Sequence, residues 1–180
     1  MVKEPRPGRV KTRLGRDIGL TTAAWWFRHQ TCRLIRRLDD PRWQIILAVS
    51  PDREGLQSRI WPEHITRLPQ GPGNLGERMA RMLRSTPGPT LVIGADIPAI
   101  TNAHISEAFK ALNRNASILG PAPDGGYWLV GLKHPARAPR TLFQDVRWST
   151  EHALEDSAKT LPKPTALTTT LQDVDTAKDL

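Results

Sequence analysis

Apolar and polar residues follow one another along the chain in two different periods, which predicts helices and strands in turn. Apolar side chains that recur every three or four residues predict a long helix over 20–38. Continuous apolar runs bounded by turn residues, at Trp43–Val49 and Thr90–Gly94, are typical of buried strands. The other expected elements are strands over 64–68, Ala116–Leu119, Tyr127–Leu132 and Ala166–Leu171, and helices over Leu75–Leu83, 102–113, 150–160 and Thr176–Leu180.

This alternation predicts an α/β fold of three layers, α/β/α, in which helices cover both faces of a mainly parallel sheet. No repeat or long linker divides the chain, so we expect one domain over residues 1–180. A doubly wound fold opens with a strand that leads into its first phosphate loop. Here only Met1–Lys3 precede the loop, so we expect a truncated first strand. The chain also stops only four residues into the last predicted helix.

The composition is that of an ordinary globular protein, with 38% apolar and 24% charged residues. No apolar run approaches the roughly 20 residues that span a bilayer, and the first residues lack the apolar core of a signal peptide. The single cysteine, Cys32, falls within the helix over 20–38, where we expect it to act as a small buried hydrophobe. A reducing, cytoplasmic location is the one we expect.

The formal net charge of +8 makes nucleic-acid binding a hypothesis. We disfavour it because no helix-turn-helix, zinc or aromatic RNA-binding pattern accompanies the charge. Arg33, Arg36 and Arg37 are expected on a solvated helix face. A second group, interrupted by Pro and Gly, is typical of a loop that suits a small polyanion at least as well as a duplex; it comprises Arg6, Arg9, Lys11, Arg13 and Arg16.

The segment Lys3–Leu14 combines glycine with basic residues, as a phosphate-binding turn does, although it lacks the GxxxxGK[ST] pattern of a P-loop. Gly8 lets the backbone approach a phosphate closely. Lys11 supplies a point charge, and Arg13 supplies a planar fork that can grip two oxygens. Taken alone, the segment is better explained as a solvated basic loop.

A carboxylate, Asp96, follows the apolar strand Thr90–Gly94. Ligands of open α/β folds bind at the carboxyl edge of the sheet, and Mg²⁺ is usually held by one or two carboxylates together with substrate phosphates. We therefore predict that Asp96 is a metal ligand. The alternative is that Asp96 caps the following helix, for which Thr101 or Asn102 is better placed.

Three further segments contain candidate ligands. The loop Gln70–Met79 places glycines before a helix whose N-terminus could face an anion. The turn Pro123–Gly126 is, by itself, typical of a hairpin. Asp173 and Asp175 precede the last helix, and Asp175 is either a second metal ligand or an N-cap with Thr176.

Together, and in this order, the segments resemble the bacterial family DUF2064, glycosyltransferase-like transferases of the nucleotide-diphospho-sugar transferase (GT-A) fold. The motifs that carry the resemblance are K-x-P-x-x-G-x-x-K-T-R-L at 3–14, G-x-L-G-x-R-M at 73–79, G-x-D-x-P at 94–98, G-P-x-x-D-G-G-Y at 120–127, W-S-T at 148–150 and D-V-D-T at 173–176. A more distant similarity extends to molybdopterin and phospholactate nucleotidyltransferases and to sugar-acid cytidylyltransferases.

The resemblance implies a site for a nucleotide and for Mg²⁺ (or Mn²⁺). The relatives grip the triphosphate with the basic loop, which implies catalytic roles for Lys11 and Arg13. They hold the metal with two aspartates, which implies that Asp96 and Asp175 are the ligands, although Pro and Glu of the relatives' D-T-P-E-D-L stretch are replaced here. The implied nucleotide contacts are Gly8, Lys11, Arg13, Gln70, Asn74, Gly76, Arg78 and Asp124.

A metal-bridged nucleotide beside a basic loop supports two reactions. In nucleotidyl transfer an acceptor attacks the α-phosphorus and pyrophosphate leaves, while the loop spreads the developing charge. In glycosyl transfer the metal holds the diphosphate of a nucleotide sugar. The positive charge over residues 6–16 suits a triphosphate better, so nucleotidyl transfer is the first hypothesis, glycosyl transfer the second and nucleotide binding without catalysis the third. The base, the acceptor and the oligomeric state stay open.

Overall fold

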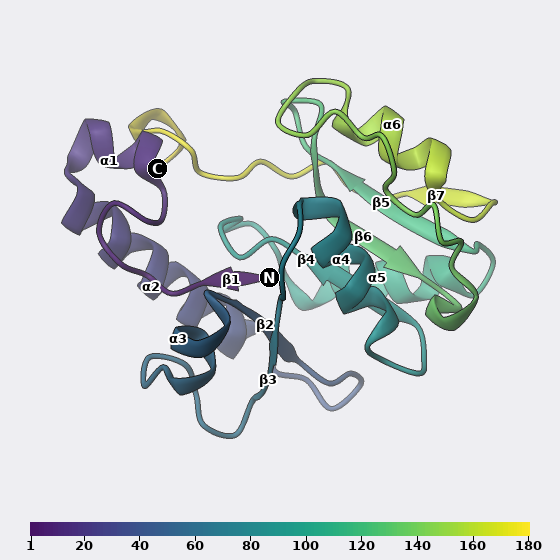
Figure 1. Ribbon diagram of the computed structural model, residues 1–180, viewed down its shortest axis with the longest axis horizontal. Helices are drawn as coiled ribbons and strands as arrows, with labels where there is room; N and C mark the ends of the chain where they lie inside the picture. Colours follow the sequence, from purple (N-terminus) through teal and green to yellow (C-terminus); the bar gives the residue numbers. More distant parts are fainter. The chain divides into compact units, whose positions relative to one another are not determined.

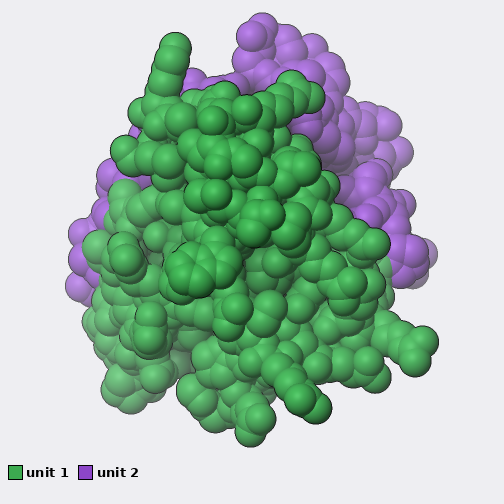
Figure 2. Space-filling view, turned by 90° about the vertical axis from the view of Figure 1, so that its left-hand side faces the viewer, with its two compact units in different colours: residues 1–71, 94–102, 173–180 green, residues 72–93, 103–172 purple.

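The computed structural model describes residues 1–180 and confirms a mixed α/β fold (Figure 1). The chain forms two compact units (Figure 2). Unit 1 comprises residues 1–71, 94–102 and 173–180, and unit 2 comprises residues 72–93 and 103–172. A single domain over the whole chain stays a prediction. None of the helices combines the length and the apolar character needed to cross a membrane.

Unit 1 is built on a sheet whose three strands are all parallel, in the order β1-β2-β3. The strands are β1 (Val2–Lys3), β2 (Ile46–Ser50) and β3 (Thr66–Pro69). Val2 pairs with Val49 and Lys3 with Ser50, so the short strand expected ahead of the loop is present. The apolar run that predicted β2 begins earlier, at Trp43, but ladder pairing starts only at Ile46.

The helices of unit 1 are α1 (Thr12–Ile18), α2 (Leu20–Arg37) and α3 (Asp52–Gln57). Helix α2 confirms the periodic pattern. Helices α1 and α3 were not predicted, because segments this short show too few apolar repeats to establish a period. Gly19, with a φ of +89°, separates α1 from α2. The last predicted helix is only a 3₁₀ turn, η2 (Ala177–Asp179).

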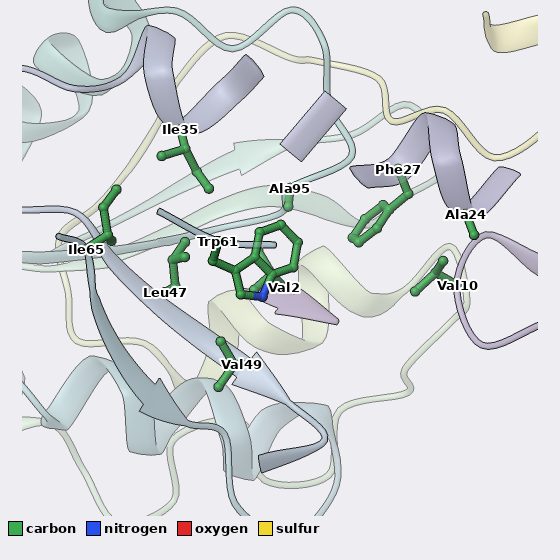
Figure 3. Packing of buried hydrophobic residues seen from close by; sticks show 10 residues of the cluster. All are labelled: Val2, Val10, Ala24, Phe27, Ile35, Leu47, Val49, Trp61, Ile65 and Ala95. Carbon is green, nitrogen blue, oxygen red and sulfur yellow. The ribbon is translucent and has the colours of Figure 1, made fainter. Parts of the chain in front are cut away.

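The apolar core of unit 1 draws on β1, β2 and α2 and includes the segment before Asp96 (Figure 3). Trp61 is 2% exposed and anchors the chain between α3 and β3. Ala95 belongs to the same cluster, so the residue directly before Asp96 is held by core packing. Cys32 packs against this cluster but is half-buried, whereas a buried side chain was predicted. The buried members are Val2, Val10, Ala24, Phe27, Ile35, Leu47, Val49, Trp61, Ile65 and Ala95.

Unit 2 has a four-stranded sheet in the order β4-β6-β5-β7. The strands are β4 (Thr90–Ile93), β5 (Ser117–Pro121), β6 (Tyr127–Leu132) and β7 (Thr165–Leu167). Strand β6 is antiparallel to both β4 and β5, whereas β5 and β7 are parallel. Three of the five pairings in the two sheets are therefore parallel, as a mainly parallel fold requires.

The strand before Asp96 differs from its prediction as a buried strand. Strand β4 is an edge strand that pairs only with β6, and its four residues are half-buried. The most buried strands of unit 2 are β5 and β6, since neither lies at an edge, and only Pro121 and Tyr127 among their residues are half-buried. The helices of this unit are α4 (Leu75–Arg84), α5 (Asn102–Leu112), α6 (Ala153–Thr160) and the 3₁₀ turn η1 (Pro135–Arg137).

Candidate functional site

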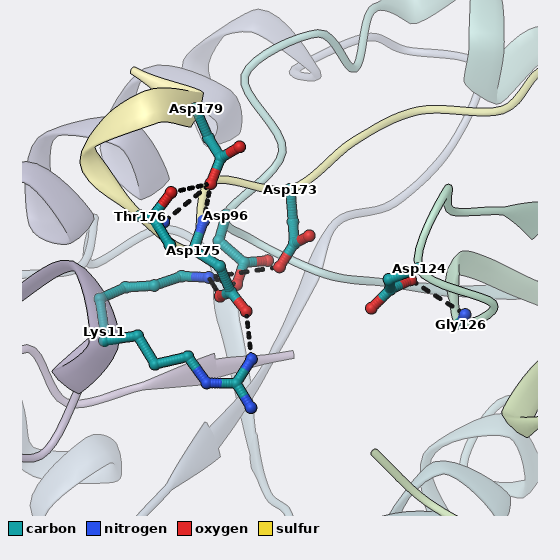
Figure 4. Close-up of polar contacts among 9 residues, drawn as sticks. Lys11, Asp96, Asp124, Gly126, Asp173, Asp175, Thr176 and Asp179 are labelled. Carbon is teal, nitrogen blue, oxygen red and sulfur yellow. Dashed lines mark hydrogen bonds and ion pairs between the residues drawn. The ribbon is translucent and has the colours of Figure 1, made fainter. Parts of the chain in front are cut away.

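Three carboxylates of unit 1 converge on the ammonium group of Lys11 (Figure 4). Lys11 Nζ lies 2.5 Å from Asp96 Oδ2, 2.8 Å from Asp175 Oδ1 and 3.4 Å from Asp173 Oδ2. The Lys11 side chain is only 8% exposed, whereas the three carboxylates are between 26% and 39% exposed. Arg13 Nη1 lies 2.9 Å from Asp175 Oδ2, and the Arg13 side chain remains 69% exposed.

The backbone brings the two carboxylate-bearing segments together. The N–H of Val174 donates to the carbonyl oxygen of Asp96 over 3.2 Å. Val174 is buried against Leu14 and Ala23. Because side chains two residues apart in extended chain point to the same side, burying Val174 turns Asp173 and Asp175 together toward Lys11. This spacing was visible in the sequence, yet only Asp175 was predicted as a ligand.

Both capping alternatives are wrong. Asp96 precedes α5 by six residues, and its carboxylate pairs with Lys11. At the C-terminal turn, the capping box is formed by Thr176 and Asp179, whose Oδ2 accepts from the Thr176 N–H at 2.8 Å. The Asp175 carboxylate therefore takes no part in capping and belongs to the cluster around Lys11.

Asp96, Asp173 and Asp175 form ion pairs with two side-chain cations, Lys11 and Arg13. The N-terminal amine of Met1 also interacts electrostatically with Asp96, but burial lowers the pKa of that amine to about 6. Burial alone would lower the pKa of Lys11, but Asp96 and Asp175 outweigh it and raise that pKa. Burial, with repulsion from the other two carboxylates, raises the pKa of Asp173. Burial acts in the same direction on Asp175, but Lys11 and Arg13 prevail and lower its pKa. Asp175 pairs with two cations, whereas Asp173 contacts only Lys11 and lies near two carboxylates, so their pKa values shift in opposite directions.

The donor set fits a hard divalent cation in its chemistry, because carboxylate oxygens are the ligands that Mg²⁺ prefers. No group of three or more His, Cys, Asp or Glu side chains has its donor atoms arranged around a metal position. The point on which the carboxylates converge is instead taken by the Lys11 ammonium. Lys11 itself has a left-handed backbone, with a φ of +43°, which is uncommon for a residue other than glycine.

Arg37 corrects one prediction, since it does not lie on a solvated helix face. Its Nη1 donates to the carbonyl oxygens of Pro98 (2.5 Å) and Ile100 (2.9 Å), in the segment that follows Asp96. The side chain is half-buried, while its neighbour Arg36 is exposed. Sequence reasoning missed this role because the contact joins residues more than 60 positions apart.

Replacing Arg37 with methionine is expected to lower the free energy of unfolding by about 2–4 kcal/mol, because two carbonyls lose a charged donor. The matched control is Arg36→Met on the same helix, because the exposed Arg36 side chain forms no ion pair or hydrogen bond. Its stability should stay within about 0.5 kcal/mol of the parent. Urea denaturation measures both. Equal effects of the two substitutions would contradict the role assigned to Arg37.

The rest of the basic loop carries less free positive charge than the sequence suggested. Arg6 and Arg9 both pair with Glu54, at 3.1 and 3.5 Å. Of the five basic residues in this group, Arg6, Arg9, Lys11, Arg13 and Arg16, only Arg16 has no carboxylate partner. Gly8 is exposed and has a φ of +75°, so its backbone conformation favours glycine whether or not a phosphate binds there.

Gln70, predicted to contact the nucleotide, is 4% exposed. Its Nε2 donates to the carbonyl oxygens of Val2 (3.0 Å) and Ala48 (2.9 Å), which ties β1 to β2. Both amide hydrogens are used on strand carbonyls, so this side chain holds together the sheet of unit 1, and a nucleotide contact by Gln70 stays a prediction.

The other four predicted contacts lie in unit 2. Asn74 caps α4 in a capping box with Glu77, so its side chain is already engaged by a backbone N–H. Arg78 Nε donates to Gly73 O at 2.8 Å, and exposed Asp124 accepts from the Gly126 N–H at 2.9 Å. A nucleotide contact by Arg78 or Asp124 stays a prediction.

Gly76 has a packing role in unit 2. It is buried, and a Cβ built there would lie 2.7 Å from the Trp148 ring and 2.8 Å from Phe143 Cβ. Trp148 in turn packs edge-on against Tyr127, whose hydroxyl accepts from Ser157 at 3.1 Å. The motifs at 73–79, 120–127 and 148–150 thus meet in one packed cluster.

Gly76→Ala is expected to destabilise the protein by about 1–3 kcal/mol, because the added methyl must displace an aromatic ring and nearby backbone. Gly88→Ala is the matched control, since a Cβ there meets nothing within 4 Å. The control should be neutral or slightly stabilising. Thermal denaturation compares the two, and a Gly76→Ala protein as stable as the control would contradict the packing role.

A protein-family model described as "Uncharacterized protein conserved in bacteria (DUF2064)" matches residues 34–150. The chain belongs to the DUF2064 family. The matched part begins within α2 and ends at the W-S-T motif, so Lys11, Arg13, Asp173 and Asp175 lie outside it. No match was found among the curated proteins.

Solved structures confirm the fold of this DUF2064 chain. One is a protein from Desulfovibrio desulfuricans with a provisional assignment as a nucleotide-diphospho-sugar transferase. It is 26% identical, the match covers 97% of this chain and 80% of that protein, and the TM-score is 0.84. The 4-diphosphocytidyl-2C-methyl-D-erythritol synthase of Anaerococcus prevotii is 11% identical over 85% of this chain and 84% of its own, with a TM-score of 0.59. The second similarity concerns the fold alone.

Proposed function

We propose that this DUF2064 protein is a transferase that acts on the phosphates of a nucleotide, with Mg²⁺ or Mn²⁺ held by Asp96 and Asp175. The observation that carries the proposal is the pairing of two opposite charge sets in unit 1, the carboxylate cluster and the cations Lys11 and Arg13. A metal-bound nucleotide needs both, since the carboxylates hold the metal and the cations hold the phosphates. The similarity to the D. desulfuricans protein supports the same substrate class.

Nucleotidyl transfer is the first reaction we propose. A metal held by Asp96 and Asp175 would neutralise the negative charge that develops on the phosphates. Arg13 has an exposed guanidinium fork that can take phosphate oxygens in pairs. Lys11, whose ammonium lies 2.8 Å from Asp175, adds a positive point charge beside the proposed metal ligands. The acceptor itself supplies the attacking oxygen, so the protein need not provide a nucleophile.

Glycosyl transfer from a nucleotide sugar is the alternative. It is favoured by the assignment that the D. desulfuricans protein carries. It is also favoured by the ion pairs of Arg6 and Arg9 with Glu54, because they reduce the positive charge that made a triphosphate attractive. Nucleotide binding without catalysis is the third possibility, and a small molecule is the acceptor we expect for either reaction.

The test is to incubate the protein with each of the four NTPs and Mg²⁺ and to follow pyrophosphate release, with parallel reactions that contain nucleotide sugars. With no other acceptor present, water takes the nucleotidyl group, and slow pyrophosphate release above that of the Asp96→Asn protein is the expected result. Turnover of nucleotide sugars with no reaction of any NTP would overturn nucleotidyl transfer in favour of the alternative. Metal-dependent binding with no turnover of either class would leave a binding protein.

A further inference from the structure

Lys11 occupies the point at which the carboxylates of the proposed metal site converge. Its ammonium contacts Asp96, Asp173 and Asp175 within 3.4 Å, and nothing else in the cluster contacts all three. A metal held by Asp96 and Asp175 would stand beside this ammonium, and two cations that share the same oxygens repel each other. Lys11 and the metal therefore compete for one position.

The length of the Lys11 side chain allows the ammonium to leave the cluster. Lys11 reaches the cluster through a flexible four-carbon stem, so its charge can move without a change in the backbone. The carboxylates are partly exposed, which gives an ion from solvent access to them while Lys11 is in place. Arg13 pairs only with Asp175, and its largely exposed guanidinium lies on the solvent side of that carboxylate.

We propose that Lys11 is an exchangeable internal cation: it fills the carboxylate cluster in the free protein, gives way to the divalent metal, and then pairs with the phosphates that arrive with that metal. The inference rests on the proposed function. In this exchange Lys11 pairs first with the carboxylates and then with the phosphates. No bond is made or broken in the exchange, and the net change is one ammonium for one metal ion at the cluster.

The exchange makes metal and nucleotide bind cooperatively. Metal alone must displace an ammonium that then has no anionic partner, so metal alone binds weakly. Nucleotide phosphates provide that partner, and each ligand therefore strengthens the binding of the other by the same factor. The free protein is also stable without metal, because its carboxylates are already partly neutralised.

The test compares binding of Mn²⁺ alone to the parent and to Lys11→Met, followed through the electron paramagnetic resonance signal of free Mn²⁺. Lys11→Met should bind Mn²⁺ at least about tenfold more tightly, because the competing ammonium is gone, a factor within the usual range of coupling between ligands. The same variant should bind Mn²⁺ with ATP, GTP, CTP or UTP more weakly than the parent. A purely structural role of Lys11 would weaken both. Arg36→Met, which removes the same charge from an exposed position of α2 in the same unit, should stay within about twofold of the parent.

Lys11→Met leaves three carboxylates close together and can fail to fold. The double variant Lys11→Met with Asp173→Asn removes one charge of each sign, so the cluster keeps its net charge and the two proposed ligands. It too should bind Mn²⁺ alone more tightly than the parent. Unchanged or weaker Mn²⁺ binding in both variants overturns the exchange, even if the parent binds metal and nucleotide. If the parent binds no nucleotide with metal, the proposed function fails, while the Mn²⁺ comparison still decides the exchange.

Discussion

Replacing Asp96 with asparagine is expected to weaken metal-dependent nucleotide binding by about 100-fold or more, equivalent to about 2.7 kcal/mol. The substitution keeps the shape of the side chain but removes the charge that a divalent cation requires from an oxygen ligand. The fold should persist, because Lys11 keeps its contacts with Asp173 and Asp175. Titration calorimetry of Mg²⁺ with the best-binding nucleotide measures the effect, and far-ultraviolet circular dichroism checks the fold.

The matched control for Asp96 is Asp39→Asn. Asp39 is exposed in the same unit, forms no ion pair, and its replacement changes the net charge by the same amount. It should leave nucleotide binding unchanged within about twofold. If Asp96→Asn binds metal and nucleotide as well as this control does, the carboxylate serves only its ion pair with Lys11, and the proposed metal site is wrong.

Replacing Gly125 with alanine is expected to lower the free energy of unfolding by about 3 kcal/mol or more. Gly125 has a φ of +83°, and a Cβ there would overlap the backbone of Glu151, which cannot rotate away as a side chain can. Its carbonyl oxygen also accepts from the Leu154 N–H at 2.9 Å, so the turn holds the start of α6. Urea denaturation gives the size of the loss.

The adjacent Gly126 provides the control for Gly125. A Cβ at Gly126 would approach only Asp124 Oδ1, at 3.1 Å, and that carboxylate can move. Gly126→Ala should therefore cost less than about 1 kcal/mol. Comparable losses in the two variants would mean that the turn, and not the close approach of Glu151, sets the requirement for glycine.

Much of the secondary structure was readable from local pattern. Helix α2 and strand β6 begin within a residue of their predicted positions, since each is long enough to repeat its period several times. Helix α4 was equally clear, and the Asn74–Glu77 capping box supplies its start signal. The failures, α1 and α3, are helices of seven and six residues. Such segments owe their helicity to packing, which a local pattern does not report.

The candidate site was only partly readable. Lys11, Arg13, Asp96 and Asp175 were predicted, and the structure brings all four together in unit 1. The sequence offered no sign that Gln70 joins two strands or that Gly76 makes room for Trp148. Polar and glycine-rich loops look alike whether they serve a ligand or the fold, because the same residue types meet both needs.

The sequence by itself determined the order of strands and helices, the family motifs and the presence of acidic and basic residues suited to a metal and phosphates. Only the tertiary structure decided which charges meet. Lys11 and Asp175 are 164 positions apart, and their 2.8 Å contact depends on how the two segments are carried by the core. Periodicity is a property of neighbouring residues, whereas an ion pair is a property of distance in space. The sequence therefore identified the charged residues of the site, but it did not show that the Lys11 ammonium lies among three carboxylates of the same chain.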